Sequence, residues 1–154
     1  MSLTAAIPLL FAACTDNNIF NPQDDVVGNY QLTVYAGRTM PATFIIQPGD
    51  PDFPEAPNGG TFVVTSGSLV VNSDGTFFEQ NNFSVTPQGQ SSQQSPPFTS
   101  SGTWNLNGTS FSFSDPSRQR FVTGTVTDDG SGDIRVNYTE DDANGTPQSY
   151  EYRR

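Results

Sequence analysis

Lysine and histidine are both absent from this 154-residue chain, and its six cationic side chains are all arginine. Without histidine, the chain lacks the side chain that most often acts as a general base and as a metal ligand. Without lysine, it has no amine for a Schiff base. We therefore expect no catalytic residue, no metal site and no cofactor, and we predict that the protein is not an enzyme.

Positive charge is scarce overall, because 16 Asp and Glu residues give the chain a net charge of −10. Nucleic-acid binding needs a cationic surface, and electrostatic docking on anionic lipid headgroups needs one as well. The charge balance argues against both kinds of partner. An acidic, solvated surface is instead expected to keep a small protein soluble.

The chain has one cysteine, Cys14, which excludes an internal disulfide. It follows a short apolar run, residues 7–11, and the small residues Ala12 and Ala13. An apolar stretch of this length is typical of a signal peptide, because a membrane span needs about 20 apolar residues. A cysteine directly after the cleavage site resembles the bacterial lipobox, in which that cysteine is lipidated. The alternative is a chance cysteine in an N-terminal tail.

These features divide the chain into three parts. We expect residues 1–13 to be a signal peptide with a truncated basic region, residues 14–27 to be the lipidated Cys14 and a flexible tether, and residues 28–154 to be one folded domain. The tether is rich in Asn and Asp and has no periodicity. A lipid on Cys14 would make a membrane the first partner of the protein. It would also place the domain in the bacterial cell envelope, at the outer membrane or facing the periplasm.

No stretch has helical periodicity, whereas alternation with a period of two is frequent. Phe111 and Phe113, for example, alternate with serines. Asp74-Gly75 and Asn107-Gly108 are the dipeptides that tight hairpins select. We predict an all-β fold of about eight or nine antiparallel strands, an up-and-down meander that closes into a small barrel. A β-sandwich is the alternative.

The interior of such a barrel is either filled by side chains or holds one small ligand. A filled core is favoured, because a domain of this size needs most of its apolar residues to fold. Residues 48–60 and 87–97, rich in Pro, Gln and Ser, are predicted loops that overhang one mouth of the barrel. We expect a shallow ligand pocket, if one forms there, to be lined by Phe53, Trp104 and Tyr138.

Several segments resemble bacterial lipocalin-like domain lipoproteins. They are Gly28-Asn29-Tyr30, Gly67-Ser68-Leu69, Asp74-Gly75-Thr76-Phe77, Ser101-Gly102-Thr103-Trp104 and Phe111-Ser112-Phe113. Lipocalins open their first strand with Gly-x-Trp and cover the Trp with an Arg of the last strand. Here Tyr30 stands in place of the Trp, and Arg153 and Arg154 both lie near the end of the chain. We expect Arg153 to close the barrel by a cation–π contact with Tyr30.

The resemblance implies a family of small exported barrels, few of which have an established ligand. The first hypothesis is a non-enzymatic, lipid-anchored envelope protein whose barrel binds a small apolar molecule or acts as an accessory domain. The alternative is a structural or protein-interaction module with a filled core, whose partner is another envelope protein. An acid-only hydrolase is a third hypothesis, for which Glu79 is the best isolated acid because it shares strand parity with Phe77. We expect Glu79 to lie near a mouth or on a solvated face, since charged side chains are seldom buried. Arg118 and Arg120 are expected to pair with surface acids.

Overall fold

The computed structural model describes residues 25–141 and 145–154, so Cys14, the predicted signal peptide and most of the predicted tether lie outside the described residues. The elements of the described part are eleven β-strands, which confirms the all-β prediction. They are β1 (Gly28–Tyr35), β2 (Arg38–Thr39), β3 (Ala42–Ile46), β4 (Gly60–Val71), β5 (Thr76–Pro87), β6 (Gln93–Gln94), β7 (Phe98–Asn107), β8 (Ser110–Asp115), β9 (Arg120–Asp128), β10 (Ile134–Asp141) and β11 (Pro147–Arg153).

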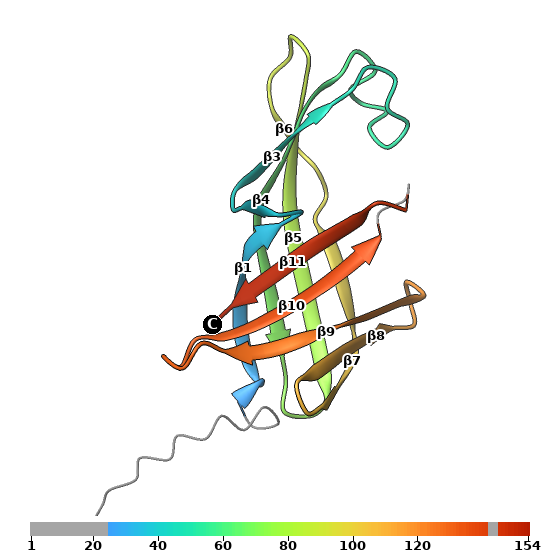
Figure 1. Cartoon of the computed structure of the whole chain (residues 1–154). Coiled ribbons are helices and arrows are strands. Elements are labelled where there is room, and N and C mark those ends of the chain that lie inside the picture. The colour runs from blue at the N-terminus through green and yellow to red at the C-terminus, as the bar shows by residue number, and fades with distance from the viewer. Residues whose placement is uncertain (1–24, 142–144) are drawn as a thin grey trace, which may run out of the picture.

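Eight of these strands form a closed antiparallel barrel (Figure 1). Around the ring their order is β1, β11, β10, β9, β8, β7, β5 and β4, and the pairing of Gly28–Gln31 with Ser68–Val71 closes the ring. From β4 to β11, each ring strand pairs with the next ring strand along the chain, as the predicted up-and-down meander requires. Closure leaves the ring without an exposed strand edge.

The predicted hairpin turns lie where the sequence placed them. Gly75 and Gly108 have φ angles of 84° and 60°, a region that glycine enters without steric cost. They connect β4 to β5 and β7 to β8. Together these two turns help to form one end of the barrel, which we call the closed end. The opposite end, where β1, β8 and β10 finish, is the mouth.

Strands β4 and β5 are twelve residues long each and continue beyond the mouth. There β4 pairs with β3 and β5 pairs with β6, which gives the projection at the top of Figure 1. We call this projection, residues 42–65 and 82–97, the extension. It has a small core of its own, in which Ile46, Ala56 and Val85 are buried. Both predicted loops belong to the extension. Three strands lie outside the ring: β3 and β6, which are part of the extension, and β2.

The barrel core is apolar toward the closed end and becomes polar toward the mouth. Tyr30, Leu69, Phe111, Val126 and Val136 are among its fully buried side chains. Their side chains fill the interior, as expected for a barrel of eight strands. The buried polar side chains are Glu79, Asn81, Ser84, Ser100, Asp115 and Arg120.

The alternation of β1 is interrupted by a bulge. Its pairing with β11 shifts between Leu32 and Val34, so that two residues of β1 face one step of its partner. Leu32 points into the core, whereas Val34 lines a hollow on the outer face. Simple alternation predicts that Val34 points into the barrel, and this prediction is wrong. Tyr35 points inward instead and packs against Phe44 and Tyr150.

Candidate functional site

Glu79 lies inside the barrel, in the middle of β5, with none of its surface exposed. Strand alternation places it there, because Phe77 and Asn81 face the same way. Its Oε2 accepts a hydrogen bond of 2.7 Å from Nη1 of Arg120, and its Oε1 accepts one of 2.6 Å from the hydroxyl of Tyr152. The hydroxyl of Tyr138 also donates to Oε1. The expectation of a solvated Glu79 is thus wrong, since enough donors converge here to keep a buried carboxylate hydrogen-bonded.

Arg120, the first residue of β9, bridges Glu79 and Glu140. Its Nε lies 2.9 Å from both carboxylate oxygens of Glu140, and its Nη2 donates to Glu140 Oε2 at 2.8 Å. The remaining Nη donors reach Glu79, Ser100 at 3.1 Å and Tyr138 at 3.2 Å. Burial alone would lower the pKa of Arg120, but the hydrogen bonds to Glu140 and the charge of Glu79 outweigh it and raise that pKa. Arg120 is therefore a buried cation and not the surface partner that we expected.

Together these residues make the buried polar cluster: Glu79, Asn81, Ser100, Arg120, Tyr138, Glu140 and Tyr152. Burial raises the pKa of the Tyr138 and Tyr152 hydroxyls, and the charge of Glu79 raises both further. Both tyrosines thus stay neutral and serve as donors to the carboxylate.

Asp115 supports the cluster from the end of β8. Its carboxylate accepts hydrogen bonds from the hydroxyls of Ser100 and Ser117 and from the backbone N–H groups of Ser101 and Arg118. Burial would raise the pKa of Asp115, but these four donors outweigh it and lower that pKa to about 2. The charged Asp115 therefore fixes Ser100, which in turn accepts from Arg120.

A pocket of about 240 Å³ lies at the mouth, beside the buried polar cluster. We call it the mouth pocket. Five of its lining residues are aromatic, and two are acidic. The lining residues are Tyr35, Phe62, Asn81, Phe83, Phe98, Glu140, Asp141, Gln148 and Tyr150. They come from strands of the ring and from the base of the extension, and both parts contribute aromatic rings.

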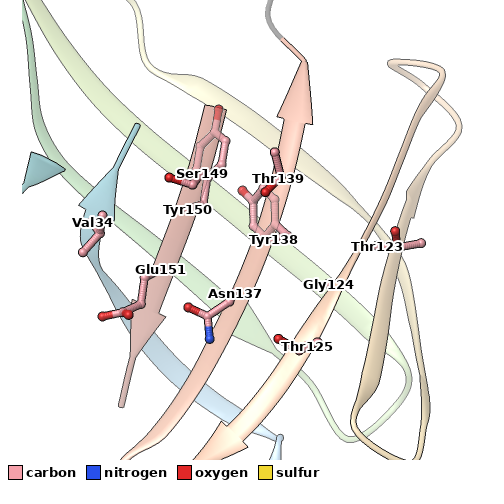
Figure 2. Close-up of a pocket in the computed structure, with 10 residues that line it drawn as sticks. All are labelled: Val34, Thr123, Gly124, Thr125, Asn137, Tyr138, Thr139, Ser149, Tyr150 and Glu151. Atoms are coloured by element: carbon pink, nitrogen blue, oxygen red, sulfur yellow. The ribbon is translucent and has the colours of Figure 1, made fainter. Parts of the chain in front are cut away.

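A second hollow, of about 530 Å³, lies on the outer face of the barrel over β1, β9, β10 and β11 (Figure 2). Figure 2 shows Asn137, Thr139, Ser149 and Glu151 along this face. The lining is mostly hydroxyl and amide groups, and the rings of Tyr138 and Tyr150 stack on each other in the barrel interior. The two hollows expose apolar surface to a similar extent, but the mouth pocket is the more enclosed of the two and has five aromatic residues in its lining, so it is the better candidate site.

The three residues predicted to line a ligand pocket are not brought together. Phe53 packs on Phe62, with ring centroids 5.2 Å apart, and Tyr138 stacks on Tyr150 at 4.5 Å. Both therefore lie directly behind residues that line the mouth pocket. Trp104 is at the closed end, where its Nε1 donates to the carbonyl of Asn72 at 2.8 Å. It faces that end because β7 runs from the mouth to the Asn107-Gly108 turn.

Tyr30 is buried at the closed end, and its hydroxyl donates to the carbonyl of Val26 at 2.6 Å. Burial raises the pKa of Tyr30 to about 12. The cation over its ring is Arg154, with Cζ 5.6 Å from the ring centroid, and not Arg153. Arg153 follows the inward Tyr152, so alternation turns it outward, where it pairs with Glu151 at 3.1 Å.

Arg120, Glu140 and Tyr150 are site residues that the sequence analysis did not select. A signal for them was present, since each continues an inward row of its strand. Arg120 shares the parity of Val122 and Val126, and Glu140 shares that of Tyr138. A charged residue that continues an apolar face at the end of a strand is therefore the sequence pattern that indicates such a site.

No protein-family model, no curated protein and no solved structure matches this chain. Within residues 25–141 and 145–154, no helix is long and apolar enough to span a bilayer. In the same residues, no three side chains of the His, Cys, Asp or Glu type gather where a metal ion would be held.

Proposed function

We propose that this chain is a non-enzymatic, lipid-anchored protein of the bacterial cell envelope whose lipocalin-like barrel binds a small apolar ligand in the mouth pocket. The observation that carries the proposal is the set of five aromatic side chains around a partly open hollow at the barrel mouth. Mostly apolar linings with a few placed polar groups are typical of small-molecule sites. The proposed anchor is a lipid on Cys14, which follows the apolar run and small residues of the N-terminal segment.

The volume of the mouth pocket limits the size of the ligand. Its volume of about 240 Å³ lies just below the roughly 300–1,000 Å³ of common small-molecule pockets. Below it, the buried polar cluster and the apolar core fill the barrel. The ligand is therefore a small molecule, or the end of a longer one whose remainder lies against the extension.

The geometry of the acids supports a binding role. Glycoside hydrolysis needs one carboxyl group as proton donor and a second as base or nucleophile, facing each other across the substrate. Glu79 and Glu140 instead bind the same guanidinium, that of Arg120. Glu79 is fully buried behind this ion pair, so it presents no oxygen to a substrate in the mouth pocket.

The second candidate function is an interaction module that contacts another envelope protein. It is favoured by Ile45 of β3, which is 78% exposed and lines a mostly apolar hollow of about 450 Å³ on the extension, with Pro48 and Pro87. Exposed apolar side chains mark interaction sites when they gather into a patch. Phe121 of β9 is 69% exposed but stands apart from this patch, on the barrel.

Native mass spectrometry of the full chain, purified gently from a bacterial envelope, tests the binding proposal. We expect an added mass that leaves only on denaturation. The variant Phe83→Trp narrows the mouth pocket and should lose that mass. Phe121→Trp makes the same exchange on the exposed outer face and should keep it. A bare mass for the unaltered chain, unchanged after incubation with small apolar compounds, would argue for the interaction module.

A further inference from the structure

We infer that the ligand of the mouth pocket is a small alkylated ammonium ion, whose apolar groups meet the aromatic lining, and not a fatty acid or another anion. The inference rests on the proposed function, because it requires the mouth pocket to be a ligand site. It is carried by three features: a cation whose donors are all engaged, a surplus of carboxylates at the pocket, and aromatic side chains from both the ring and the extension.

Among residues 25–141 and 145–154, Arg120 is the buried cation, and it has no donor left for an anionic ligand. An arginine has five N–H donors. In Arg120, the Nε hydrogen goes to Glu140, the Nη1 pair goes to Glu79 and Ser100, and the Nη2 pair goes to Tyr138 and Glu140. A ligand carboxylate would have to displace one of the two glutamates, so it finds no ready partner here.

The carboxylates of the site outnumber its cations. Glu140 and Asp141 line the mouth pocket, and no arginine is among its lining residues. The side chain of Glu140 is 30% exposed. With the buried Glu79 there are three carboxylates, against two arginines: Arg120 of the buried polar cluster, and Arg118 over the ring of Phe98. The net charge of −10 on the whole chain adds to the attraction of a cation during approach.

The aromatic rings of the pocket include two packed pairs, one from the extension and one from the ring. Phe62 and Phe83, with centroids 5.5 Å apart, are the pair from the extension. Tyr35 and Tyr150, 5.1 Å apart, are the pair from the ring. Aromatic rings that surround a hollow are the recognised environment of alkylated ammonium ions, because the face of each ring is electronegative. The same chain places Arg38 over Phe44 and Arg118 over Phe98, both at 4.9 Å.

Calorimetric titration of the full chain with three small probes tests the inference. The probes are choline, its neutral isostere 3,3-dimethylbutan-1-ol, and hexanoate as a small anion. Choline and the alcohol have nearly the same shape, so the difference between them reports the charge. We expect choline to bind at least about tenfold more tightly than the alcohol, and hexanoate to bind more weakly still.

Variants locate the binding in the mouth pocket. Asp141→Asn removes an exposed pocket carboxylate and should weaken choline binding about threefold. Phe83→Leu keeps an apolar side chain but removes a ring face, and should weaken it about fivefold. Asp133→Asn makes the same charge change at an exposed position in the β9–β10 turn and should leave binding unchanged. Thermal unfolding of each variant confirms that the fold is retained.

The outcomes separate this inference from the proposed function. Equal binding of choline and the alcohol, or preferential binding of hexanoate, would overturn the inference while the pocket remains a ligand site. The inference would also be overturned if Asp141→Asn and Phe83→Leu bound choline as tightly as Asp133→Asn does. The cation would then bind outside the mouth pocket. Absence of binding by all three probes, with a bare native mass, would overturn the inference and the proposed function together.

Discussion

Arg120 holds two glutamates that differ in burial. The side chain of Glu79 is 0% exposed and that of Glu140 is 30% exposed, and both lie within 2.8 Å of the guanidinium. Removing one member of a buried ion pair leaves an uncompensated charge out of water, whereas an exposed pair contributes little. The two residues therefore form a matched comparison inside one molecule.

We expect Glu79→Gln to lower the free energy of unfolding by about 3–5 kcal/mol, as measured for broken buried ion pairs. Glu140→Gln should lower it by less, about 1–3 kcal/mol, because the side chain of Glu140 is partly exposed although the guanidinium that it holds is buried. Urea denaturation of both variants and of the unaltered protein measures the difference. Equal losses would show that burial does not set the strength of these pairs.

The buried tyrosines limit the stability of the folded protein at alkaline pH. Burial raises the pKa of Tyr30 to about 12, and burial together with neighbouring groups raises the pKa of Tyr138, Tyr150 and Tyr152 above the usual 10. A group whose folded-state pKa is raised contributes full stability below its unfolded pKa and loses it as pH rises toward the folded value.

We therefore expect stability to fall as pH increases from about 10 to about 12. Tyrosinate absorbance should appear together with the loss of the circular dichroism of the folded state, because these four of the five tyrosines ionise on unfolding. Parallel spectroscopic titrations measure this. A full tyrosinate signal from a still-folded protein would contradict the burial argument.

At the scale of the strand, several elements owe their positions to close backbone approach. Gly124 of β9 is paired with Tyr138 of β10 and with Phe111 of β8. A β-carbon at Gly124 would collide with the carbonyl oxygen of Asn137 and with the β-carbon of Tyr138. The glycine therefore makes room for the aromatic side chain that donates to Glu79.

We expect Gly124→Ala to lower the free energy of unfolding by about 1–3 kcal/mol, the usual cost of overpacking. Thr125→Ala, one position further on and exposed, should change it by less than about 0.5 kcal/mol. Thermal and urea unfolding of the pair provide the measurement. A Gly124→Ala protein as stable as the Thr125→Ala protein would mean that β9 and β10 separate easily.

The sequence predicted those elements whose signals are local. Alternation and Asp-Gly or Asn-Gly turns predicted the β4–β5 and β7–β8 hairpins, the meander and the barrel. The extension was not predicted, because which part of β4 pairs with β3 and which with β1 depends on distant strands. The bulge that turns Val34 outward likewise has no marker within β1.

The candidate site was predicted less well than the fold. Phe53 and Tyr138 each contact an aromatic residue that lines the mouth pocket but do not line it themselves. Trp104 lies at the closed end of the barrel. Parity gives the face of a strand on which a residue lies but not its height along the barrel axis. That height follows from the stagger of the strands, which no single segment encodes.

At the scale of the whole molecule, the proposed anchor can be tested apart from the pocket. When the full chain is produced in a bacterium, we expect it to be cleaved before Cys14 and to carry added acyl mass on that cysteine. Cys14→Ser should remove the acyl mass and move the protein out of the membrane fraction. Intact-mass measurement and fractionation test both points. An unmodified, uncleaved chain would leave Cys14 as a chance cysteine.

The buried polar cluster also has a consequence for the lifetime of the folded protein. Glu79 meets Arg120, Tyr138 and Tyr152 across sequence separations of 41, 59 and 73 residues. Contacts so far apart along the chain form after the local hairpins, since loop closure must come first. Interactions absent from the transition state slow unfolding without speeding folding. We therefore expect the ion pair between Glu79 and Arg120 to form late in folding, so that breaking it speeds unfolding and leaves the folding rate nearly unchanged.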